Sequence, residues 1–404
     1  MTTIKTTAAE LAILGGPPAF AEPLHVGRPN IGDRARLIER FNRILDSRWL
    51  TNDGPFVRDF EQRVAEMLGV GHCLAMCNGT VALEIAIRAL GMAGEVIVPS
   101  FTFVATVHAL QWQEITPVFG DIDPETHLLD PDCVERLITP RTTGIIGVHV
   151  WGNACAVDRL EPIARRHHLR LLYDAAHAFG CSHGGRMLGN FGDAEVFSFH
   201  ATKFVNTFEG GAVTTNDGAL ASRMRLMRNF GFSGFYDQVD YLGTNGKLSE
   251  VAAAMGLTSL ESLDAFVEVN RRNHARYAEE LRGTPGLRLR RYDGGGQHNF
   301  QYIVVEVDQE RFGLSRDELA AVLHAENVLA RRYFYPGCHR MEPYRSRFPE
   351  AGRQLPVTER VCGRVLILPT GTAVGEEEIR AIGAIVRAAG AAPAVVRGRL
   401  KERT

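Results

Sequence analysis

One lysine and one aspartate in this sequence stand where a shielded chemical site could form. Lys203 lies in a polar turn between two strand-like runs, within the segment FSFHATKFVNTFEGGAVTTND at 197–217. An amine that is partly shielded from water there would bind its proton less tightly and could attack an aldehyde. Asp174 follows the apolar run at 171–173 and precedes two alanines, so a strand would deliver one carboxylate among small side chains. A buried carboxylate needs a cationic or hydrogen-bond-donating partner.

Each of the two residues also has an ordinary explanation. Lys203 could be a solvated turn lysine, and Asp174 could cap the segment that follows it. In combination they provide what pyridoxal 5′-phosphate (PLP) chemistry requires. The lysine would hold the cofactor as a Schiff base, and the carboxylate would keep the pyridine nitrogen protonated, so that the ring accepts electrons. We therefore predict PLP as the cofactor, Lys203 and Asp174 as catalytic residues, and no metal ion.

A second turn could hold the phosphate of that cofactor. Gly79 and Thr80 lie between a short strand at 73–76 and an apolar helix at 81–90. A helix N-terminus offers free backbone N–H groups and a positive dipole end to an anion, and Thr80 adds a hydroxyl. Many such turns bind nothing, so the pattern supports a phosphate site only beside the lysine and the aspartate. Ser198, five residues before the lysine, could join this group.

The elements around these residues alternate between strand and helix. Apolar runs typical of buried strands are separated by helical patterns, which indicates a mostly parallel sheet covered on both faces. In such sheets ligands bind at the carboxyl ends of the strands, where Phe103, His149, Asp174 and His177 are found. We expect strands at 95–99, 116–121, 144–150, 170–174 and 195–199, and helices at 103–113, 130–138 and 157–168.

Composition is that of an ordinary globular protein. The 404 residues are 45% hydrophobic and 23% charged, with a formal net charge of −2, so we expect no nucleic-acid partner. No apolar run is long enough to cross a bilayer, and the N-terminal stretch lacks the pattern of a signal peptide. The seven cysteines form no CxxC motif, which favours free thiols. We expect a cytoplasmic protein with no membrane partner.

The length favours more than one domain. A Pro- and Gly-rich arm at 1–29, expected to lie on a surface, precedes a large PLP-binding domain at 30–265 and a small C-terminal domain at 266–404. A helical pattern without proline at 250–281 is long enough to bridge the two domains.

Three segments resemble the DegT/DnrJ/EryC1/StrS family of sugar aminotransferases. They are YDAAHAFG at 173–180, the lysine segment FSFHATK with FEGGAVTTND, and GTNGKLSEVAAAMGL at 243–257. The resemblance implies PLP-dependent transferase fold type I, similar to aspartate aminotransferase. It implies a mostly parallel seven-stranded sheet in the large domain, a smaller C-terminal α/β domain, and a homodimer with shared active sites.

The resemblance also implies roles for single residues. Lys203 would form the internal aldimine and move protons, and Asp174 would pair with the pyridinium nitrogen. His177 would sit near the phenolic oxygen of the ring, and Phe103 would stack on it. Phosphate contacts would come from Gly79, Thr80 and Ser198, with Asn245 reaching the phosphate from the partner subunit.

Other polar and aromatic residues are candidates for the substrate. Tyr333, Tyr335 and His339 lie in a loop rich in aromatic residues and arginines that could wall a nucleotide sugar, although a cluster that packs two domains together would look alike. His149 at a strand end and Glu209 near the lysine complete the predicted substrate contacts.

The segment HATKFVNTFEGGA resembles enzymes that aminate C4 of dTDP-4-keto-6-deoxyglucose, so the resemblance implies transfer of an amino group from L-glutamate to that carbon. The products would be dTDP-4-amino-4,6-dideoxyglucose and 2-oxoglutarate, a step of deoxysugar biosynthesis for natural-product glycosylation. The alternatives are amination at C3 of a dTDP-3-keto-deoxysugar, a PLP-dependent sugar dehydratase, and a silent regulatory homologue. Lys203 argues against the dehydratase, because dehydrating relatives carry histidine at that position. An NAD-dependent enzyme is disfavoured because no GxGxxG follows the first strand.

Overall fold

The computed structural model describes residues 2–234, 236–292 and 295–402. The first residue of the expected arm and the last two of the expected C-terminal domain therefore lie outside the described residues.

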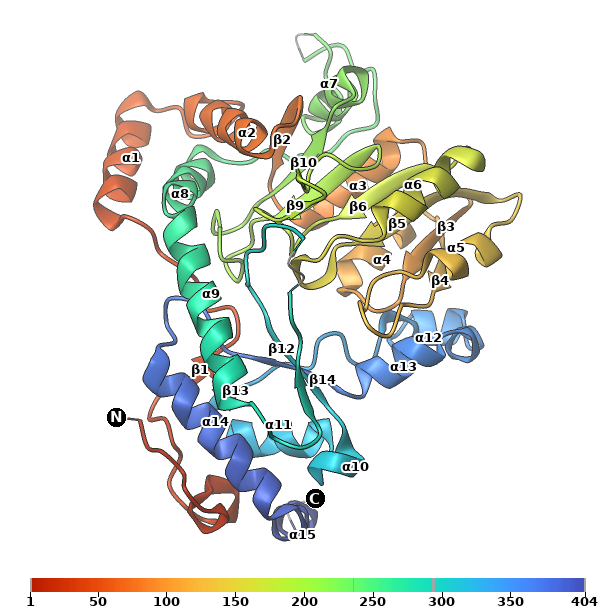
Figure 1. The fold of residues 1–404 in the computed structure, drawn as a ribbon. Helices are drawn as coiled ribbons and strands as arrows, with labels where there is room; N and C mark the ends of the chain where they lie inside the picture. Colours follow the sequence, from red (N-terminus) through yellow and green to blue (C-terminus); the bar gives the residue numbers. More distant parts are fainter. Residues whose placement is uncertain (1, 235, 293–294, 403–404) are drawn as a thin grey trace.

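A seven-stranded sheet forms the centre of the larger part of the molecule (Figure 1). β10 runs antiparallel to both of its neighbours, and the other neighbouring strands are parallel. The mostly parallel seven-stranded sheet predicted from the sequence is therefore confirmed. In spatial order the strands are β2 (His72–Met76), β10 (Gly211–Thr215), β9 (Ala194–Ser198), β6 (Arg170–Asp174), β5 (Thr142–Val148), β3 (Glu95–Pro99) and β4 (Thr116–Gly120).

Helices cover both faces of this sheet, because each contributes one apolar stripe to the core. Alternate strand residues enter two separate hydrophobic clusters, as the two-residue period of a strand requires. One face carries α3 (Gly79–Ala89), α4 (Val104–Gln111) and α7 (Gly218–Met227). The other carries α2 (Pro55–Leu68), α5 (Pro131–Leu137), α6 (Val157–Arg166) and α8 (Glu250–Glu261), with α1 (Arg34–Ser47) outside α8.

Helix starts are fixed by side chains that the sequence supplies at the right place. The side chains of Asp33, Asn78, Asp217 and Ser249 accept backbone N–H groups at the starts of α1, α3, α7 and α8. The cap of α3 belongs to the site, because the start of this helix lies at the carboxyl end of the sheet.

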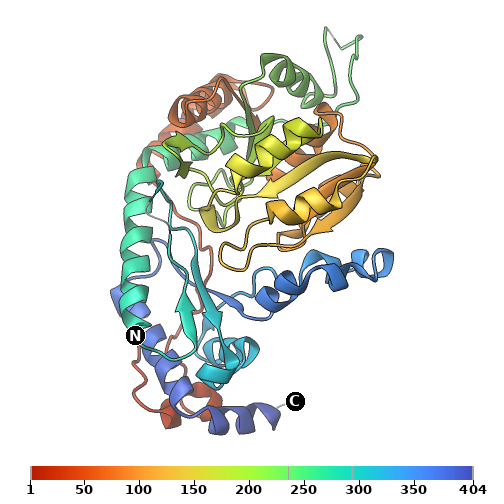
Figure 2. The same cartoon turned by 45° about the vertical axis from the view of Figure 1, so that its right-hand side comes forward.

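A smaller sheet forms the second part of the molecule. Its three antiparallel strands are β11 (Leu287–Leu289), β12 (Ile303–Val307) and β14 (Val365–Leu368), and α9 (Leu263–Glu280), α11 (Arg316–Ala325) and α14 (Glu376–Ala391) share its core. In Figures 1 and 2, α9 runs from the seven-stranded sheet to this smaller sheet, with α14 alongside it. The remaining short elements are β1 (Leu24–His25), β7 (Ser182–His183), β8 (Arg186–Met187), α10 (Gln309–Phe312), β13 (Val328–Leu329), α12 (Tyr344–Arg347), α13 (Pro356–Cys362) and α15 (Pro393–Lys401).

Within the described residues no single helix has both the length and the apolar character to cross a membrane. Only α14 and α15 taken together reach that threshold, and they form a pair bent by 88°.

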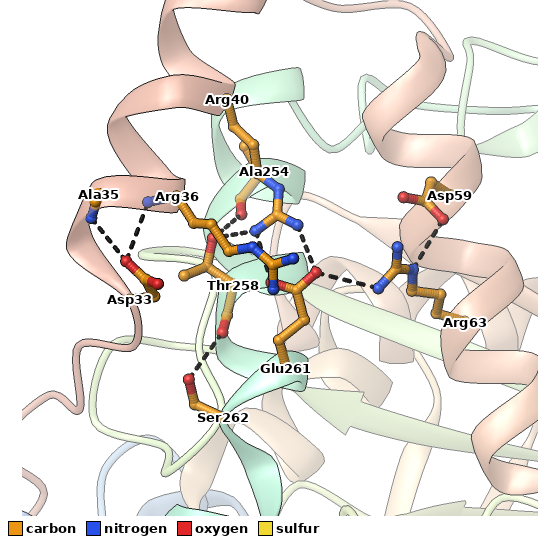
Figure 3. A network of polar contacts seen from close by, with 10 residues as sticks. All are labelled: Asp33, Ala35, Arg36, Arg40, Asp59, Arg63, Ala254, Thr258, Glu261 and Ser262. Carbon is orange, nitrogen blue, oxygen red and sulfur yellow. Dashed lines mark hydrogen bonds and ion pairs between the residues drawn. The ribbon is translucent and has the colours of Figure 1, made fainter.

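The bridging helix expected at 250–281 is two helices, which corrects the prediction. The chain breaks at Ser262 between α8 and α9. Ser262 Oγ donates to the carbonyl of Thr258 at 3.2 Å, and Thr258 Oγ1 donates to that of Ala254 at 2.9 Å; such bonds to the preceding turn bend helices. Beside the break, the Glu261 carboxylate forms ion pairs with three arginines, Arg36 and Arg40 of α1 and Arg63 of α2. These ion pairs connect α1 and α2 to α8 (Figure 3).

The N-terminal arm is anchored more firmly than a surface arm would be. Lys5 and Glu326 are both buried, with Lys5 Nζ 3.8 Å from Glu326 Oε2. The backbone N–H groups of Ala12 and Ala19 donate to the two carboxylate oxygens of Glu326 at 2.6 and 2.7 Å. A buried ion pair persists only when its remaining hydrogen bonds are made, and here the arm makes them.

Candidate active site

A cavity of about 270 Å³ opens at the carboxyl end of the seven-stranded sheet. Nine of the predicted site residues line it, although they are spread along some 250 residues of sequence. The nine are Gly79, Thr80, Phe103, Asp174, His177, Ser198, Lys203, Glu209 and Tyr333. A larger cavity, of about 1170 Å³, lies between α9 and β11 and contains none of them.

Lys203 lies in the turn that links β9 to β10, and hydrogen bonds within the turn and to Asn30 hold this turn in place. Its backbone N–H donates to the carbonyl of His200 at 2.8 Å. Asn206 Nδ2 donates to the carbonyl of Asn30, and Asn30 Nδ2 donates to that of Phe204. The turn therefore holds the lysine in one place without using its amine.

The Lys203 amine has the properties of a nucleophile near neutral pH. Burial lowers its pKa to about 8, against the opposing attraction of the Asp174 carboxylate. Its Nζ donates to the hydroxyl of Tyr302 at 3.3 Å.

Asp174 ends β6 on the face of the sheet that α3 and α4 cover. Oδ2 accepts from the Thr106 hydroxyl at 2.8 Å, and Oδ1 accepts from the backbone N–H of Ala176 at 3.0 Å. Burial raises the pKa of this carboxyl, and these hydrogen bonds and the charge of Lys203 oppose the rise. The site thus holds a buried carboxylate with limited charge compensation, which a cationic ring nitrogen would supply.

His177 forms part of the cavity wall as a neutral imidazole. Burial and the charge of Lys203 hold its pKa well below the usual value. Its Nδ1 accepts from the backbone N–H of Trp151 at 3.3 Å, so the ring proton lies on Nε2. The ring packs against that of Tyr302, with centroids 4.4 Å apart.

The start of α3 approaches the sheet closely enough to form a cradle. A Cβ on Gly211 in β10 would lie 2.7 Å from the backbone nitrogen of Gly79, and one on Gly79 would lie 3.2 Å from Ser198 Cβ. A side chain at position 211 would therefore force the backbone apart, and one at position 79 would require Ser198 to shift slightly. The N–H groups at the start of this 11-residue helix face the same cavity as the Thr80 and Ser198 hydroxyls, an arrangement that suits a phosphate group.

Three further predicted residues lie at the edge of the cavity. Phe103 caps the start of α4 and is 59% exposed, which leaves its ring free to cover a ligand. Glu209 faces the cavity beside His200, with its Oε1 3.4 Å from His200 Nε2. Tyr333 enters from the C-terminal part of the chain, and its hydroxyl accepts from Arg331 at 2.8 Å.

Two predicted residues lie outside the cavity on the surface of the chain. Asn245 is exposed, and its Oδ1 accepts from Lys247 Nζ at 2.6 Å. Tyr335 is 43% exposed and lies between the guanidinium groups of Arg316 and Arg332.

The structure does not bring His149 and His339, two predicted substrate contacts, to the cavity, because both side chains are buried elsewhere. His149 follows β5 on the face of the sheet opposite Asp174, where its Nε2 lies 3.1 Å from Glu195 Oε2. His339 Nδ1 lies 2.7 Å from Ser100 Oγ, and its Nε2 lies 2.8 Å from Glu359 Oε1. Both residues hold parts of the fold together.

Among the other residues that line the cavity, Tyr302 and Arg331 are the two whose polar groups bear most directly on the chemistry, and the sequence did not point to either. Tyr302 directly precedes β12, 99 residues after Lys203, and only the folded chain brings its hydroxyl to the lysine. Arg331 also lines the cavity, and its guanidinium donates to the Tyr333 hydroxyl rather than to a carboxylate in the described part of the chain. The sequence offered only weak signals for them: Tyr302 is an aromatic residue next to a strand, and Arg331 is an arginine that follows a short strand.

Residues 32–387 match the DegT/DnrJ/EryC1/StrS aminotransferase family. The chain belongs to this family. A family member from Shigella dysenteriae, dTDP-4-amino-4,6-dideoxy-D-glucose transaminase, is 38% identical over 315 residues, covering 78% of this chain and 85% of its own. GDP-perosamine synthase of Caulobacter vibrioides is 36% identical over 84% of this chain and 92% of its own.

The fold agrees with that of solved family members. The crystal structure of DesI in the presence of its TDP-sugar product superimposes with a TM-score of 0.91 and 52% sequence identity, covering 98% of this chain and 99% of that one. The chain is an aminotransferase of PLP-dependent fold type I, as the sequence predicted.

Proposed function

We propose that this aminotransferase uses PLP to move an amino group from L-glutamate to C4 of dTDP-4-keto-6-deoxyglucose. The products are dTDP-4-amino-4,6-dideoxyglucose and 2-oxoglutarate. The observation that carries the proposal is the meeting of Lys203, Asp174 and the α3 start in one cavity of a chain that is similar to dTDP-4-amino-4,6-dideoxy-D-glucose transaminases.

The residues present fit PLP. A cradle at which a Cβ on Gly79 or Gly211 would crowd its neighbours suits the phosphate, and a buried carboxylate at Asp174 suits a protonated ring nitrogen. When bound, PLP stabilises the negative charge that develops at the amino acid's α-carbon. Lys203 would hold PLP through its aldehyde carbon, and its amine would move the α-proton of the amino acid. Phe103 and His177 hold the ring in place.

The substrates need a cationic group at the cavity, because glutamate carries two carboxylates and the sugar nucleotide a diphosphate. Besides Lys203, the only arginine or lysine among the described lining residues is Arg331. A guanidinium group suits carboxylate and phosphate alike. We assign it to the anionic groups of the substrates, with the Tyr333 hydroxyl orienting it.

We further propose a homodimer in which each subunit completes the site of the other. Asn245 is exposed and outside its own cavity, as a residue that serves the partner would be. Large apolar side chains stay exposed on the same chain, among them Phe103, Phe208 and Phe230, and a partner would cover them.

Amination at C3 is the second candidate. A relative from Acidithiobacillus ferrooxidans, UDP-N-acetyl-3-dehydro-alpha-D-glucosamine 3-aminotransferase, is 34% identical over 88% of this chain. The same lysine could serve either carbon, since the carbon that is aminated depends on how the sugar lies in the cavity.

The test is turnover with defined substrates. The purified chain is incubated with PLP and L-glutamate, together with dTDP-4-keto-6-deoxyglucose or, in a parallel sample, a dTDP-3-keto-deoxysugar, and the products are analysed by mass spectrometry and NMR. We expect equimolar 2-oxoglutarate and an amino sugar with nitrogen at C4. Nitrogen at C3 of a 3-keto substrate, with the 4-keto sugar untouched, would favour the second candidate. Absence of 2-oxoglutarate with every keto sugar would refute the proposal.

A further inference from the structure

A chain of polar contacts leads from His177 away from the cavity into the protein interior. The backbone N–H of Trp151 donates to His177 Nδ1 at 3.3 Å, and the indole N–H of Trp151 donates to His127 Nδ1 at 3.3 Å. His127 Nε2 in turn lies 3.2 Å from Glu306 Oε1 in β12. Trp151 and His127 are fully buried and lie behind the cavity wall, since neither lines the cavity.

The contacts fix the proton positions on both imidazoles. Because Trp151 donates to Nδ1 of each ring, the remaining proton of each neutral imidazole must lie on Nε2. His127 Nε2 lies 3.2 Å from Glu306 Oε1 but makes no hydrogen bond in the described part of the chain. For His177 it lies on the nitrogen that Trp151 does not occupy, and burial keeps the pKa of that ring well below the usual value.

The backbone of Trp151 and that of His127 both have an unusual conformation. Trp151 has φ 63° and His127 has φ 61°, the left-handed region that favours glycine. Such a conformation persists only where the surroundings over-determine it, and it is often found where a side chain must be aimed. The indole ring stacks on Phe334 at 5.5 Å between centroids, and Phe101 packs edge-on against both Trp151 and His127.

We propose that Trp151, held by its indole hydrogen bond to His127, is a positioning residue that keeps the proton of His177 on Nε2 and its ring in one orientation. His177 then always presents the same N–H donor on the cavity side. Glu306 lies in β12 of the smaller sheet, whereas Trp151 and His177 lie in the segments that follow β5 and β6 of the larger sheet. The chain of contacts therefore also makes this donor depend on how the two sheets are placed.

The proposal rests on the proposed function only for the use of the N–H donor. It can be tested on the full chain without PLP and without substrates, by NMR of protein carrying ¹⁵N-labelled histidine. In the wild type we expect His177 as the single Nε2–H form at pH 7 and at pH 8. In His127→Leu, which removes the acceptor of the indole N–H, we expect both proton positions to be populated. His127→Gln, whose amide oxygen can accept the same bond, should restore the single form.

Trp151→Phe removes the same bond from its other end and provides a second route if His127→Leu does not fold. Phe101→Leu is the matched control, because it removes ring contacts with both residues but no hydrogen bond, and His177 should stay in the Nε2–H form. For the PLP-loaded enzyme, we expect His127→Leu to lower kcat about tenfold with little change in KM, since small misplacement of a positioned group can cost up to about 10²-fold.

A single Nε2–H form in both His127→Leu and Trp151→Phe would overturn the proposal and leave the contacts as packing alone. That outcome does not depend on turnover, so it stays distinct from failure of the proposed function. If the wild type showed the Nδ1–H form, the proposal would also be wrong.

Discussion

The acidity of Lys203 gives a prediction that can be worked out in numbers. With a pKa of about 8, about 9% of the amine is neutral at pH 7 and about 91% at pH 9. A lysine at the ordinary value of about 10.4 would be neutral in only about 0.04% of molecules at pH 7. Burial thus raises the share of nucleophilic amine at pH 7 by a factor of about 200.

The assay is competitive labelling with acetic anhydride, followed by mass spectrometry of the lysine peptides. The chain has four lysines, Lys5, Lys203, Lys247 and Lys401, so each can be followed separately. For Lys203 we expect labelling that rises about tenfold from pH 7 to 9. The midpoint of the rise should lie near pH 8, with a plateau at higher pH. Lys5 serves as a built-in control and should stay unlabelled, because its buried Nζ donates to the carbonyls of Glu10 and Pro17.

The variant Asp174→Asn tests the cause of this acidity. The Asp174 carboxylate raises the pKa of Lys203, so its loss should move the midpoint below 8, by about one unit or more. Turnover should nevertheless fall by about 10³-fold, since a neutral amide cannot keep the cofactor ring protonated. A midpoint near 10 in the wild type, or one that stays at 8 in the variant, would refute the reasoning.

Three further changes test other parts of the account. Gly211→Ala places a methyl group 2.7 Å from the backbone at the start of α3, so PLP should bind at least about tenfold more weakly in equilibrium dialysis; unchanged affinity would argue against the cradle. Glu326→Ala leaves Lys5 as an unpaired buried charge, and the free energy of unfolding in urea should fall by about 3–5 kcal/mol. A loss below about 1 kcal/mol would show that the arm is not anchored there. Mixing Asn245→Ala with Lys203→Ala should recover about one quarter of wild-type activity, because half of randomly mixed dimers are hybrids with one intact site. No recovery after demonstrated subunit exchange would place each site within one chain.

The meeting of Asp174, Ser198 and Lys203 in one cavity could be expected from local rules. Asp174 and Ser198 end strands whose apolar runs leave little choice, and Asn78 caps a helix whose start must face the same edge of the sheet. Parallel strands bring their carboxyl ends together, so the meeting of these residues with Lys203 follows from the pattern.

The misplaced residues depend on which face a side chain takes and on distant packing. His149 stands at the expected strand end, but strand alternation turns it toward Glu195 on the opposite face from Asp174. The break at Ser262 comes from side-chain bonds to the preceding turn, which a helical period does not reveal. Tyr302 lies beside the smaller sheet and Lys203 beside the larger one, so no local sequence pattern predicts their contact.

The central claim is that Lys203 is the residue that captures PLP. Borohydride reduction of the PLP-loaded chain fixes the cofactor to the amine that holds it, and peptide mapping then identifies that amine among the four lysines. The account predicts the label on the peptide containing Lys203 alone, and none after Lys203→Ala. A label on another lysine in the wild type, or an undiminished label in the variant, would contradict it.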